Sequence, residues 1–180
     1  MDPLTHVCSG VLLGQALRPA SAVRLSTLLI LGAAAFAPDL DAVSYLWGAD
    51  VYGRVHHSYT HALPGLAAVA TALAGVETLW LPAISFVRLL LLNAAGVTLH
   101  LLGDLVTVWP LRILWPWSDR DFVLRWTGDF DLAVLVVVGL ATGLAATDNL
   151  RAHARWIALA AAVILAVYFL WFAGAAGLRA

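Results

Sequence analysis

The chain has 180 residues, of which 62% are hydrophobic and only 12% are charged, and its mean hydropathy is +0.89. A soluble domain usually carries about 25% charged residues. This composition excludes a free-standing water-soluble enzyme. It also excludes a disordered chain, which needs low hydrophobicity and high charge. We therefore expect one integral membrane domain covering residues 1–180.

Charge and cysteine content narrow the function classes further. The formal net charge is −1, all ten cationic side chains are arginines, and there is no lysine. Because no basic face is available, nucleic acid is not an expected partner. The single cysteine, Cys8, cannot form an intrachain disulfide. The first residues lack the basic region of a secretory signal, so we interpret them as mature sequence.

Six helices are predicted from the apolar stretches between charged residues, because about 20 apolar residues cross ~30 Å of hydrocarbon. In chain order they cover residues 3–17, 21–37, 62–87, 89–108, 132–147 and 156–178. The first two are expected to form a short hairpin whose turn contains Arg18, Pro19 and Arg24. Arg88 is expected to mark a tight turn at an interface, because an arginine at mid-bilayer is costly.

Two connections are too polar to lie within the membrane, residues 38–61 and 109–131, and the second is rich in tryptophan. Two pairs of glycines at four-residue spacing predict close approach between helices. They are Gly10 with Gly14 and Gly139 with Gly143.

Six crossings place residues 38–61 and 109–131 on one side of the membrane. The short loops on the other side contain Arg18, Arg24, Arg88, Arg151 and Arg155. By the positive-inside rule that side is cytoplasmic, so residues 38–61 and 109–131 face outward. The outer side holds as many arginines, namely Arg54, Arg112, Arg120, Arg125 and Arg179. The charge count alone therefore leaves the orientation open.

The motif Pro38-Asp39-Leu40-Asp41 ends the second predicted helix. Pro38 discourages a regular continuation of the helix, and in extended backbone residues two apart project to one side. Neighbouring carboxylates repel each other unless a cation lies between them, so a metal ion is their natural partner. The alternative is a helix end followed by solvated turn aspartates.

Three histidines occur in HHSYTH, directly before the third predicted helix: His56, His57 and His61. His56 and His61 can reach one site only if the first lies in the loop and the second on the first helical turn. Ser58 or Thr60 would then cap the helix. His57 is the weaker candidate of the adjacent pair. The alternative interpretation is a group of interfacial histidines at a helix start.

His100 and Asp104 are four residues apart in an apolar helix and therefore share a face, which Thr107 continues. Ionisable residues in membrane segments are costly and usually functional. The alternative is a buried, hydrogen-bonded His–Asp pair between helices. His6, near the start of the first helix, is a candidate only because the topology places it at the same level.

The topology places seven candidate metal ligands on the same side of the membrane. They are His6, Asp39, Asp41, His56, His61, His100 and Asp104. Seven nitrogen and oxygen ligands without cysteine exceed a four-coordinate zinc site and fit two or three ions of Zn or Mn. Clustered divalent ions activate water and stabilise oxyanions, so hydrolysis is the implied reaction.

Four sequence blocks, in order, resemble a known family. They are MDPLTH, PDLD, HHSYTHAL, and HLLGDLVT followed by a loop rich in tryptophan and proline. Over roughly residues 1–118 the chain looks like the YdjM-type membrane-bound metal-dependent hydrolases. That family more often has His-Arg-x-x-Thr-His-Ser in the third block, whereas this chain has His57 for the Arg and Ala62 for the Ser. Arg54 is a candidate substitute for that arginine in phosphate binding.

The YdjM-type family is in turn similar to the helical zinc-dependent phospholipase C and P1 nuclease group. The His-x-x-x-Asp motif of that group matches His100 and Asp104. This resemblance implies a related helical core, clustered zinc and phosphoester hydrolysis, without fixing a substrate.

Other polar residues have simpler interpretations. Asp129 and Asp131 precede the fifth helix and are expected to form its N-cap, with metal binding as the alternative. Three arginines of the second polar connection are expected to anchor at lipid headgroups, with binding of a lipid phosphate as the alternative. These are Arg112, Arg120 and Arg125.

We therefore expect an all-α bundle in a prokaryotic plasma membrane that hydrolyses an amphiphilic or lipid phosphoester at an outer-side site. Asp39 or Asp41 would aid the attacking water, and Arg54 and Thr107 would contact the substrate. Membrane lipids are expected partners. The main alternative is a transporter of metal ions or protons, although such sites usually lie near the midplane. The second alternative is a bis-histidine haem protein, although haem does not need paired aspartates.

Overall fold

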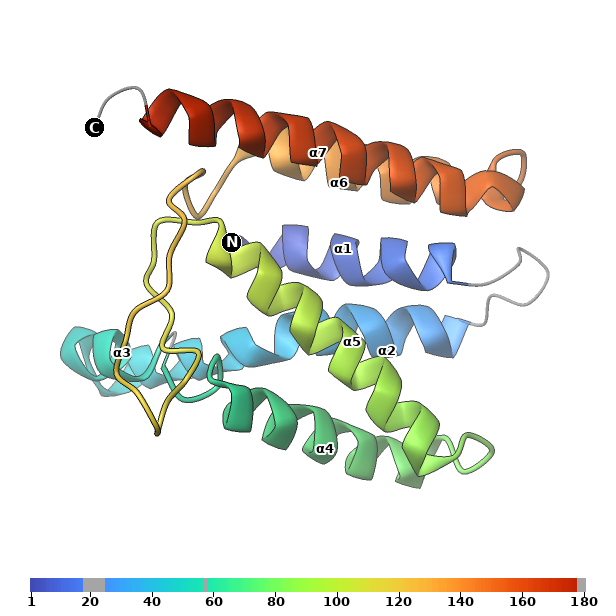
Figure 1. Ribbon diagram of the computed structural model, residues 1–180. Coiled ribbons are helices and arrows are strands. Elements are labelled where there is room, and N and C mark those ends of the chain that lie inside the picture. The colour runs from blue at the N-terminus through green and yellow to red at the C-terminus, as the bar shows by residue number, and fades with distance from the viewer. Residues whose placement is uncertain (18–24, 57, 178–180) are drawn as a thin grey trace.

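The structure is a computed structural model that describes residues 1–17, 25–56 and 58–177 (Figure 1). The described elements are α1 (Pro3–Ala16), α2 (Leu25–Phe36), the 3₁₀ helix η2 (Ala37–Trp47), α3 (Ala49–Val55), α4 (Leu63–Trp80), α5 (Phe86–Leu105), α6 (Leu132–Ala146), the 3₁₀ helix η3 (Arg151–His153) and α7 (Ala154–Gly177). The predicted all-α class is confirmed.

Helices α1, α2, α4, α5, α6 and α7 lie side by side in one bundle, as the sequence predicts (Figure 1). α1 packs against α2 and α6, α5 packs against α2 and α4, and α7 packs against α6. Successive helices alternate in direction, so the α4–α5 turn and the α6–α7 connection lie at one end. The N-terminus, α3 and the segment 106–131 lie at the other end, which we call the site end.

The outer surface of the bundle is suited to a membrane. Within the described residues, four helical segments are long and apolar enough to cross one, namely Leu25–Trp47, Leu63–Trp80, Phe86–Leu105 and Arg151–Gly174. α6 is apolar but has 15 residues, and α1 has 14, about 21 Å at 1.5 Å per residue. The chain is therefore a membrane protein in which two helices are shorter than the bilayer is thick.

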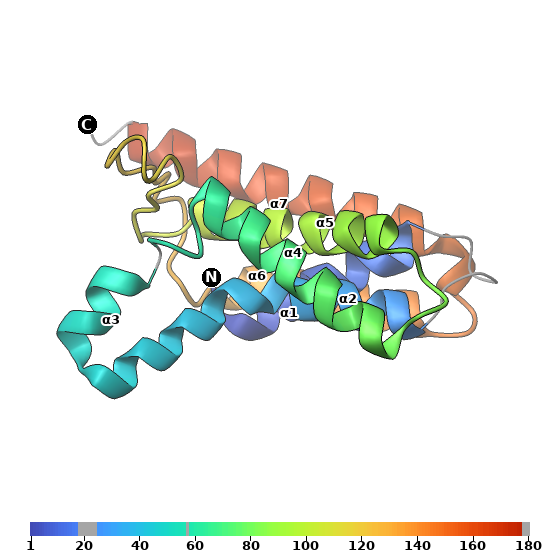
Figure 2. The ribbon, with the colours of Figure 1, turned by 90° about the horizontal axis from the view of Figure 1, so that it is seen from below.

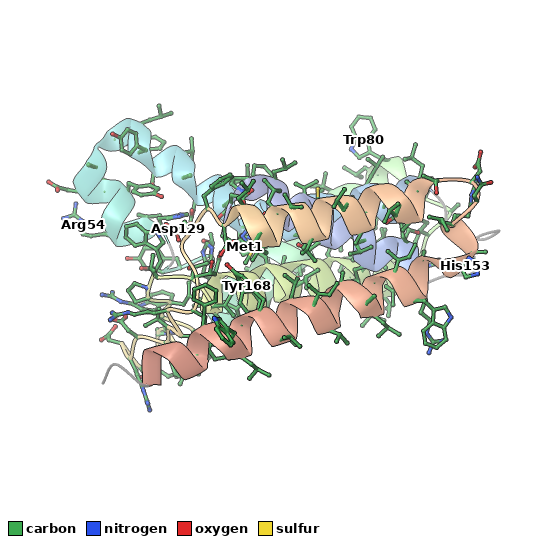
Figure 3. All side chains as sticks on the ribbon, turned by 90° about the horizontal axis from the view of Figure 1, so that it is seen from above. Met1, Arg54, Trp80, Asp129, His153 and Tyr168 are labelled. Carbon is green, nitrogen blue, oxygen red and sulfur yellow. The ribbon has the colours of Figure 1, made fainter. Side chains whose placement is uncertain are left out.

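Exposed tryptophans lie at both ends of the bundle, as they do at the two interfaces of a membrane. Trp80 and Trp156 are exposed at the end opposite the site end, where Figure 3 shows Trp80 pointing outward. Trp47 and Trp117 are exposed at the site end. These two belts place the site end at a membrane–water boundary.

Local sequence explains where α1 begins and how closely it packs. The Asp2 carboxylate accepts the Thr5 amide at 2.9 Å, and Pro3 occupies the first helical position. At Gly10 an added Cβ would lie 2.3 Å from the carbonyl oxygen of Leu31, so only glycine permits this α1–α2 approach. The predicted contact at Gly10 is thus confirmed.

The second predicted glycine contact is wrong. An added Cβ at Gly139 or Gly143 would have no described atom of another element within 4 Å. Both glycines lie on α6, whose buried face is formed by Val134, Val138 and Ala141. Four-residue spacing in a helix rich in small residues is therefore not sufficient to indicate packing.

One predicted boundary is also wrong. Pro82 cannot continue α4, so the turn falls at residues 81–85 and Arg88 lies on the first turn of α5. The predicted end of the second helix is confirmed to within one residue, because α2 ends at Phe36; the chain then continues directly as the 3₁₀ helix η2, whose first turn tolerates Pro38. The predicted turn at Arg18, Pro19 and Arg24 lies outside the described residues, as do His57 and Arg179.

Candidate metal centre

The aspartates of the PDLD motif lie on η2, which continues α2 beyond the bundle before α3 folds back (Figure 2). Both are buried, with exposed fractions of 9% for Asp39 and 8% for Asp41. The predicted extended backbone is wrong here. A 3₁₀ helix turns about 120° per residue, so residues two apart point in different directions. Asp39 and Asp41 accordingly approach opposite nitrogens of one ring, Nε2 and Nδ1 of His61, at 3.8 and 3.5 Å.

Four side chains from three parts of the chain converge at the site end. Asp39 comes from η2, His61 from the turn before α4, and His100 and Asp104 from α5. One potential ligand atom from each lies within 4.8 Å of all the others. We call these four residues the inner cluster. The predicted shared face of His100 and Asp104 is confirmed, since His100 Nε2 lies 2.9 Å from Asp104 Oδ2.

Hydrogen bonds around the inner cluster determine where its protons lie. His100 Nδ1 donates to the carbonyl oxygen of Ala35 at 2.7 Å, so the neutral ring presents a lone pair at Nε2. The Thr60 hydroxyl donates to Asp41 Oδ2 at 2.5 Å, and its oxygen lies 2.9 Å from His61 Nδ1. The neutral His61 ring then donates from Nδ1 and also presents a lone pair at Nε2.

The lone pairs of the inner cluster face one another. The two Nε2 atoms of His61 and His100 are 2.9 Å apart, and Asp104 Oδ2 is 3.3 Å from His61 Nε2. Among the described residues, none donates a hydrogen bond to Asp104 Oδ2, although that atom is buried. Buried lone pairs that meet in this way require a cation between them.

The pKa of His61 also indicates that the cluster favours a positive charge. Burial lowers this pKa, but the carboxylates of Asp104 and Asp41 outweigh burial and raise it to about 9. The cluster thus attracts a proton, and a divalent cation meets the same electrostatic demand. Two imidazole nitrogens and two carboxylates form a donor set suited to such an ion.

The remaining predicted ligands flank the inner cluster. His6 is fully buried, its Nε2 lies 3.0 Å from Asp104 Oδ1, and its ring stacks on His100 at 3.9 Å. The α-amino group of Met1 also donates to Asp104. On the other side, His56 Nδ1 lies 2.6 Å from Asp41 Oδ1. All seven predicted ligands are therefore in one connected network, with four of them at its centre.

Thr60 is the functional residue whose role the sequence did not reveal. The predicted cap at Ser58 or Thr60 is wrong, because α4 begins after Ala62 and has no side-chain cap. Thr60 instead links Asp41 to His61, as described above. Its position next to a candidate histidine was the available signal. The carbonyl of Ala35 carries no such signal, because any residue supplies a carbonyl.

Two pockets open at the site end. A pocket of about 490 Å³ reaches the inner cluster at Asp39 and is also lined by Met1, Tyr52, His56, Trp109 and Asp129. A second pocket of about 330 Å³ shares His56 and includes Arg54, Arg112 and Tyr59. Because His56 lines both pockets, they adjoin at the metal centre.

The two predicted substrate contacts differ in position. Arg54 lies exposed on α3 and lines the second pocket. Thr107 is fully buried, and its hydroxyl donates to the carbonyl oxygen of Asp104 at 2.8 Å. Thr107 thus secures the end of α5 instead of facing a pocket.

The two acidic residues before α6 have separate roles. Asp131 accepts the amides of Ala133 and Val134 at 2.9 and 3.2 Å, which confirms its predicted N-cap position. Asp129 accepts a hydrogen bond from Trp109 Nε1 and is not part of the cap. Neither residue belongs to the inner cluster.

Comparisons with known proteins agree with this architecture. The model of the YdjM inner membrane protein family matches residues 1–178. This chain belongs to the YdjM family. Among its relatives, a protein of Bacillus subtilis (strain 168) described as uncharacterized protein YfhP is 30% identical over 76% of this chain. The chain spans 43% of the length of YfhP.

A second relative has a size closer to that of this YdjM family member. The inner membrane protein YbcI of Escherichia coli (strain K12) is 30% identical over 68% of this chain and 72% of its own length. No solved structure matches the chain. The family and the apolar helices together establish a membrane protein with a buried cluster that could hold a metal ion.

Proposed function

We propose that this YdjM family member is a membrane-bound, metal-dependent hydrolase that cleaves a phosphoester of an amphiphilic or lipid substrate. The observation that carries the proposal is the convergence of two imidazole and two carboxylate side chains in one buried cluster, of which Asp39 lines an accessible pocket. In hydrolysis, water oxygen bonds to phosphorus, the ester P–O bond breaks, and the leaving oxygen takes up a proton.

The inner cluster would hold the first ion, and zinc fits its two imidazoles and two carboxylates, with manganese as the alternative. When bound, such an ion lowers the pKa of water and stabilises negative charge on phosphoryl oxygens. His6 and the Asp41–His56 pair flank this position on opposite sides. They are the residues available for a second or third ion, as in the zinc-dependent phospholipase C and P1 nuclease group.

Asp39 is the best placed group to accept a proton from the attacking water. Its carboxylate lines the 490 Å³ pocket and also belongs to the inner cluster. Asp41 is held by His56 at 2.6 Å and by Thr60 at 2.5 Å, which favours a positioning role. Arg54 and Arg112 line the adjoining pocket, where guanidinium groups can bind the substrate phosphate.

The position of the centre favours hydrolysis over transport. A transport site is expected near the bilayer midplane with access from both faces. Here the inner cluster lies at one end of the bundle, and the pockets that reach it open at that same end. A substrate at headgroup depth would meet the centre without crossing the membrane.

The decisive experiment compares metal content and phosphoester hydrolysis for the wild type and Asp104→Asn. Asp104→Asn keeps the side-chain shape but removes the buried charge. We expect loss of bound metal and a fall in hydrolysis beyond the ~10–100-fold typical for an outer-sphere change. Asp148→Asn is the matched control, because Asp148 is exposed at the opposite end beside Arg151. Unchanged metal content and hydrolysis in Asp104→Asn would overturn the proposal.

A further inference from the structure

A third pocket lies along the bundle next to the metal centre. It has a volume of about 190 Å³ and is lined by residues of four helices. α1 contributes Thr5 and Ser9, α5 contributes Leu99, Leu102 and Gly103, α6 contributes Val134 and Val138, and α7 contributes Leu165 and Phe169, while Val106 directly follows α5. These spacings of three and four residues place one face of each helix along the cavity. We call it the α5–α7 groove.

The groove presents almost only hydrocarbon. Its two hydroxyl side chains already donate hydrogen bonds within the protein. Thr5 Oγ1 donates to Asp2 Oδ2 at 2.5 Å, and Ser9 Oγ donates to the carbonyl oxygen of Thr5. The other lining side chains are apolar, and the charged α-amino group of Met1 is paired with Asp104. A ligand of this groove therefore has no polar group to satisfy along its length.

The groove adjoins the metal centre. Met1 lines both the groove and the 490 Å³ pocket above Asp39. Within the groove, an added Cβ at Gly103 would lie 3.1 Å from Cε1 of His6, which contacts Asp104. Met1 and Asp129 line the same 490 Å³ pocket, and Figure 3 shows both at the site end of the bundle. A ligand with a polar head and an apolar tail would thus have a place for each part.

We propose that the α5–α7 groove holds a hydrocarbon chain of the substrate, so that the substrate is a long-chain phosphoester. This inference rests on the proposed hydrolase function and names its substrate class. The phosphoester head lies over Asp39, and the chain enters sideways from the membrane between α5 and α7. A packed helix would not fit, because a helix is about 10 Å across and the groove holds about 190 Å³.

The kinetic test uses a substitution that fills the groove with a larger side chain. Leu165 is half-buried in its wall, whereas Leu170 on the same helix is 66% exposed. Leu165→Trp should lower kcat/KM for a long-chain phospholipid about tenfold, because an indole in the groove overpacks a bound chain, and overpacking typically costs the free energy of about a tenfold loss in binding. Hydrolysis of the water-soluble p-nitrophenyl phosphate should stay within about twofold. Leu170→Trp is the matched control and should change neither rate.

A second test does not depend on hydrolysis. A phospholipid with a photoreactive diazirine in its acyl chain is incubated with Asp104→Asn protein in nanodiscs, irradiated, and the labelled peptides are mapped. We expect labels at residues 99–106 and 165–169, and their loss when Leu165→Trp is added but not when Leu170→Trp is added. This result would support the groove even if the proposed hydrolysis failed.

Three outcomes would overturn the inference. The first is even labelling of all exposed apolar faces, including Leu79 on α4 and Val163 on α7. The second is labelling of the groove that Leu165→Trp does not reduce. The third is cross-linking of groove residues to a second copy of the chain, which would make the groove an interface between copies.

Discussion

At the scale of single residues, the tautomer of His61 depends on Thr60. The Thr60 hydroxyl lies between His61 Nδ1 at 2.9 Å and Asp41 Oδ2 at 2.5 Å. Such outer partners fix the ring and the proton of a metal-binding histidine. We expect Thr60→Val to weaken metal binding about 10–100-fold, measured by competition with a chromogenic chelator. Val keeps the shape of Thr, so the loss isolates the hydroxyl.

Thr60→Ser is the matched control for this prediction, because it retains the hydroxyl and removes only a methyl group. It should bind metal nearly as the wild type does. Equal affinity in Thr60→Val would show that Asp41, whose Oδ2 lies 3.5 Å from His61 Nδ1, orients the ring without help.

The residues of the site were more predictable than their arrangement. The costly polar side chains of an apolar sequence identified Asp39, His61, His100 and Asp104, because such residues need a function to be retained. The 3₁₀ geometry of η2 was not predictable, since Pro38 favours several backbone conformations. For that reason Asp41 was expected beside Asp39, whereas it contacts the opposite side of the His61 ring.

At the scale of elements, the α1–α2 contact depends on Gly10. An added Cβ would lie 2.3 Å from the Leu31 carbonyl oxygen, which belongs to the backbone and cannot rotate away. We expect Gly10→Ala to lower the free energy of unfolding by about 1–3 kcal/mol, the range for overpacking. Denaturant titration in detergent micelles would measure it.

Gly139→Ala makes the same change where an added Cβ meets no described atom of another element within 4 Å. It should be neutral or stabilising by up to about 1 kcal/mol, because alanine favours a helix. Equal destabilisation by both substitutions would contradict the close approach at Gly10.

The N-terminus of α6 is held by Asp131, which also accepts the Tyr168 hydroxyl of α7 at 2.7 Å. Burial raises the Asp131 pKa, but hydrogen bonds from Thr127, Tyr168 and the helix amides outweigh burial and lower it. The carboxylate therefore stabilises the fold above its unfolded pKa of about 3.9, and this contribution disappears as the pH falls through the lower folded value.

Asp131→Asn keeps an N-cap acceptor and removes the charge, so it should reduce the free energy of unfolding at pH 7 by about 0.3–1 kcal/mol, the usual contribution of a negative charge at a helix N-terminus. The difference between wild type and variant should shrink as the pH falls below about 4. Comparing the two proteins at each pH cancels the titration of all other groups. A difference that is the same at pH 7 and pH 3 would show that the charge of Asp131 has no part in the contact.

At the scale of the whole molecule, the apolar stretches between charged residues predicted the six-helix bundle and its alternating directions. The boundaries shifted where local signals compete. Pro82 ended α4 before Arg88, because proline cannot continue a helix, while Pro38 was accommodated at the start of η2. The length of α1 did not predict that this helix packs among its neighbours. In the structure its 14 residues are short for a membrane span but lie inside the bundle.

The placement of the arginines predicts an orientation for the bundle. At the end opposite the site end, Arg88, Arg151 and Arg155 lie on or beside short connections, where the positive-inside rule applies most strongly. At the site end, Arg112 forms an ion pair with Asp121 at 3.7 Å, in a segment that also contains Asp119. We therefore expect the metal centre on the outer side of the membrane.

Cysteine labelling of intact bacterial cells measures this orientation. In a Cys8→Ser background, Asp119→Cys introduces a thiol at an exposed position of the site end, and His153→Cys introduces one at the opposite end. A membrane-impermeant maleimide should label Asp119→Cys in intact cells and His153→Cys only after permeabilisation. Because each variant is the other's control for reactivity, the reverse pattern would place the centre in the cytoplasm. Its substrate would then be a phosphoester of the inner leaflet.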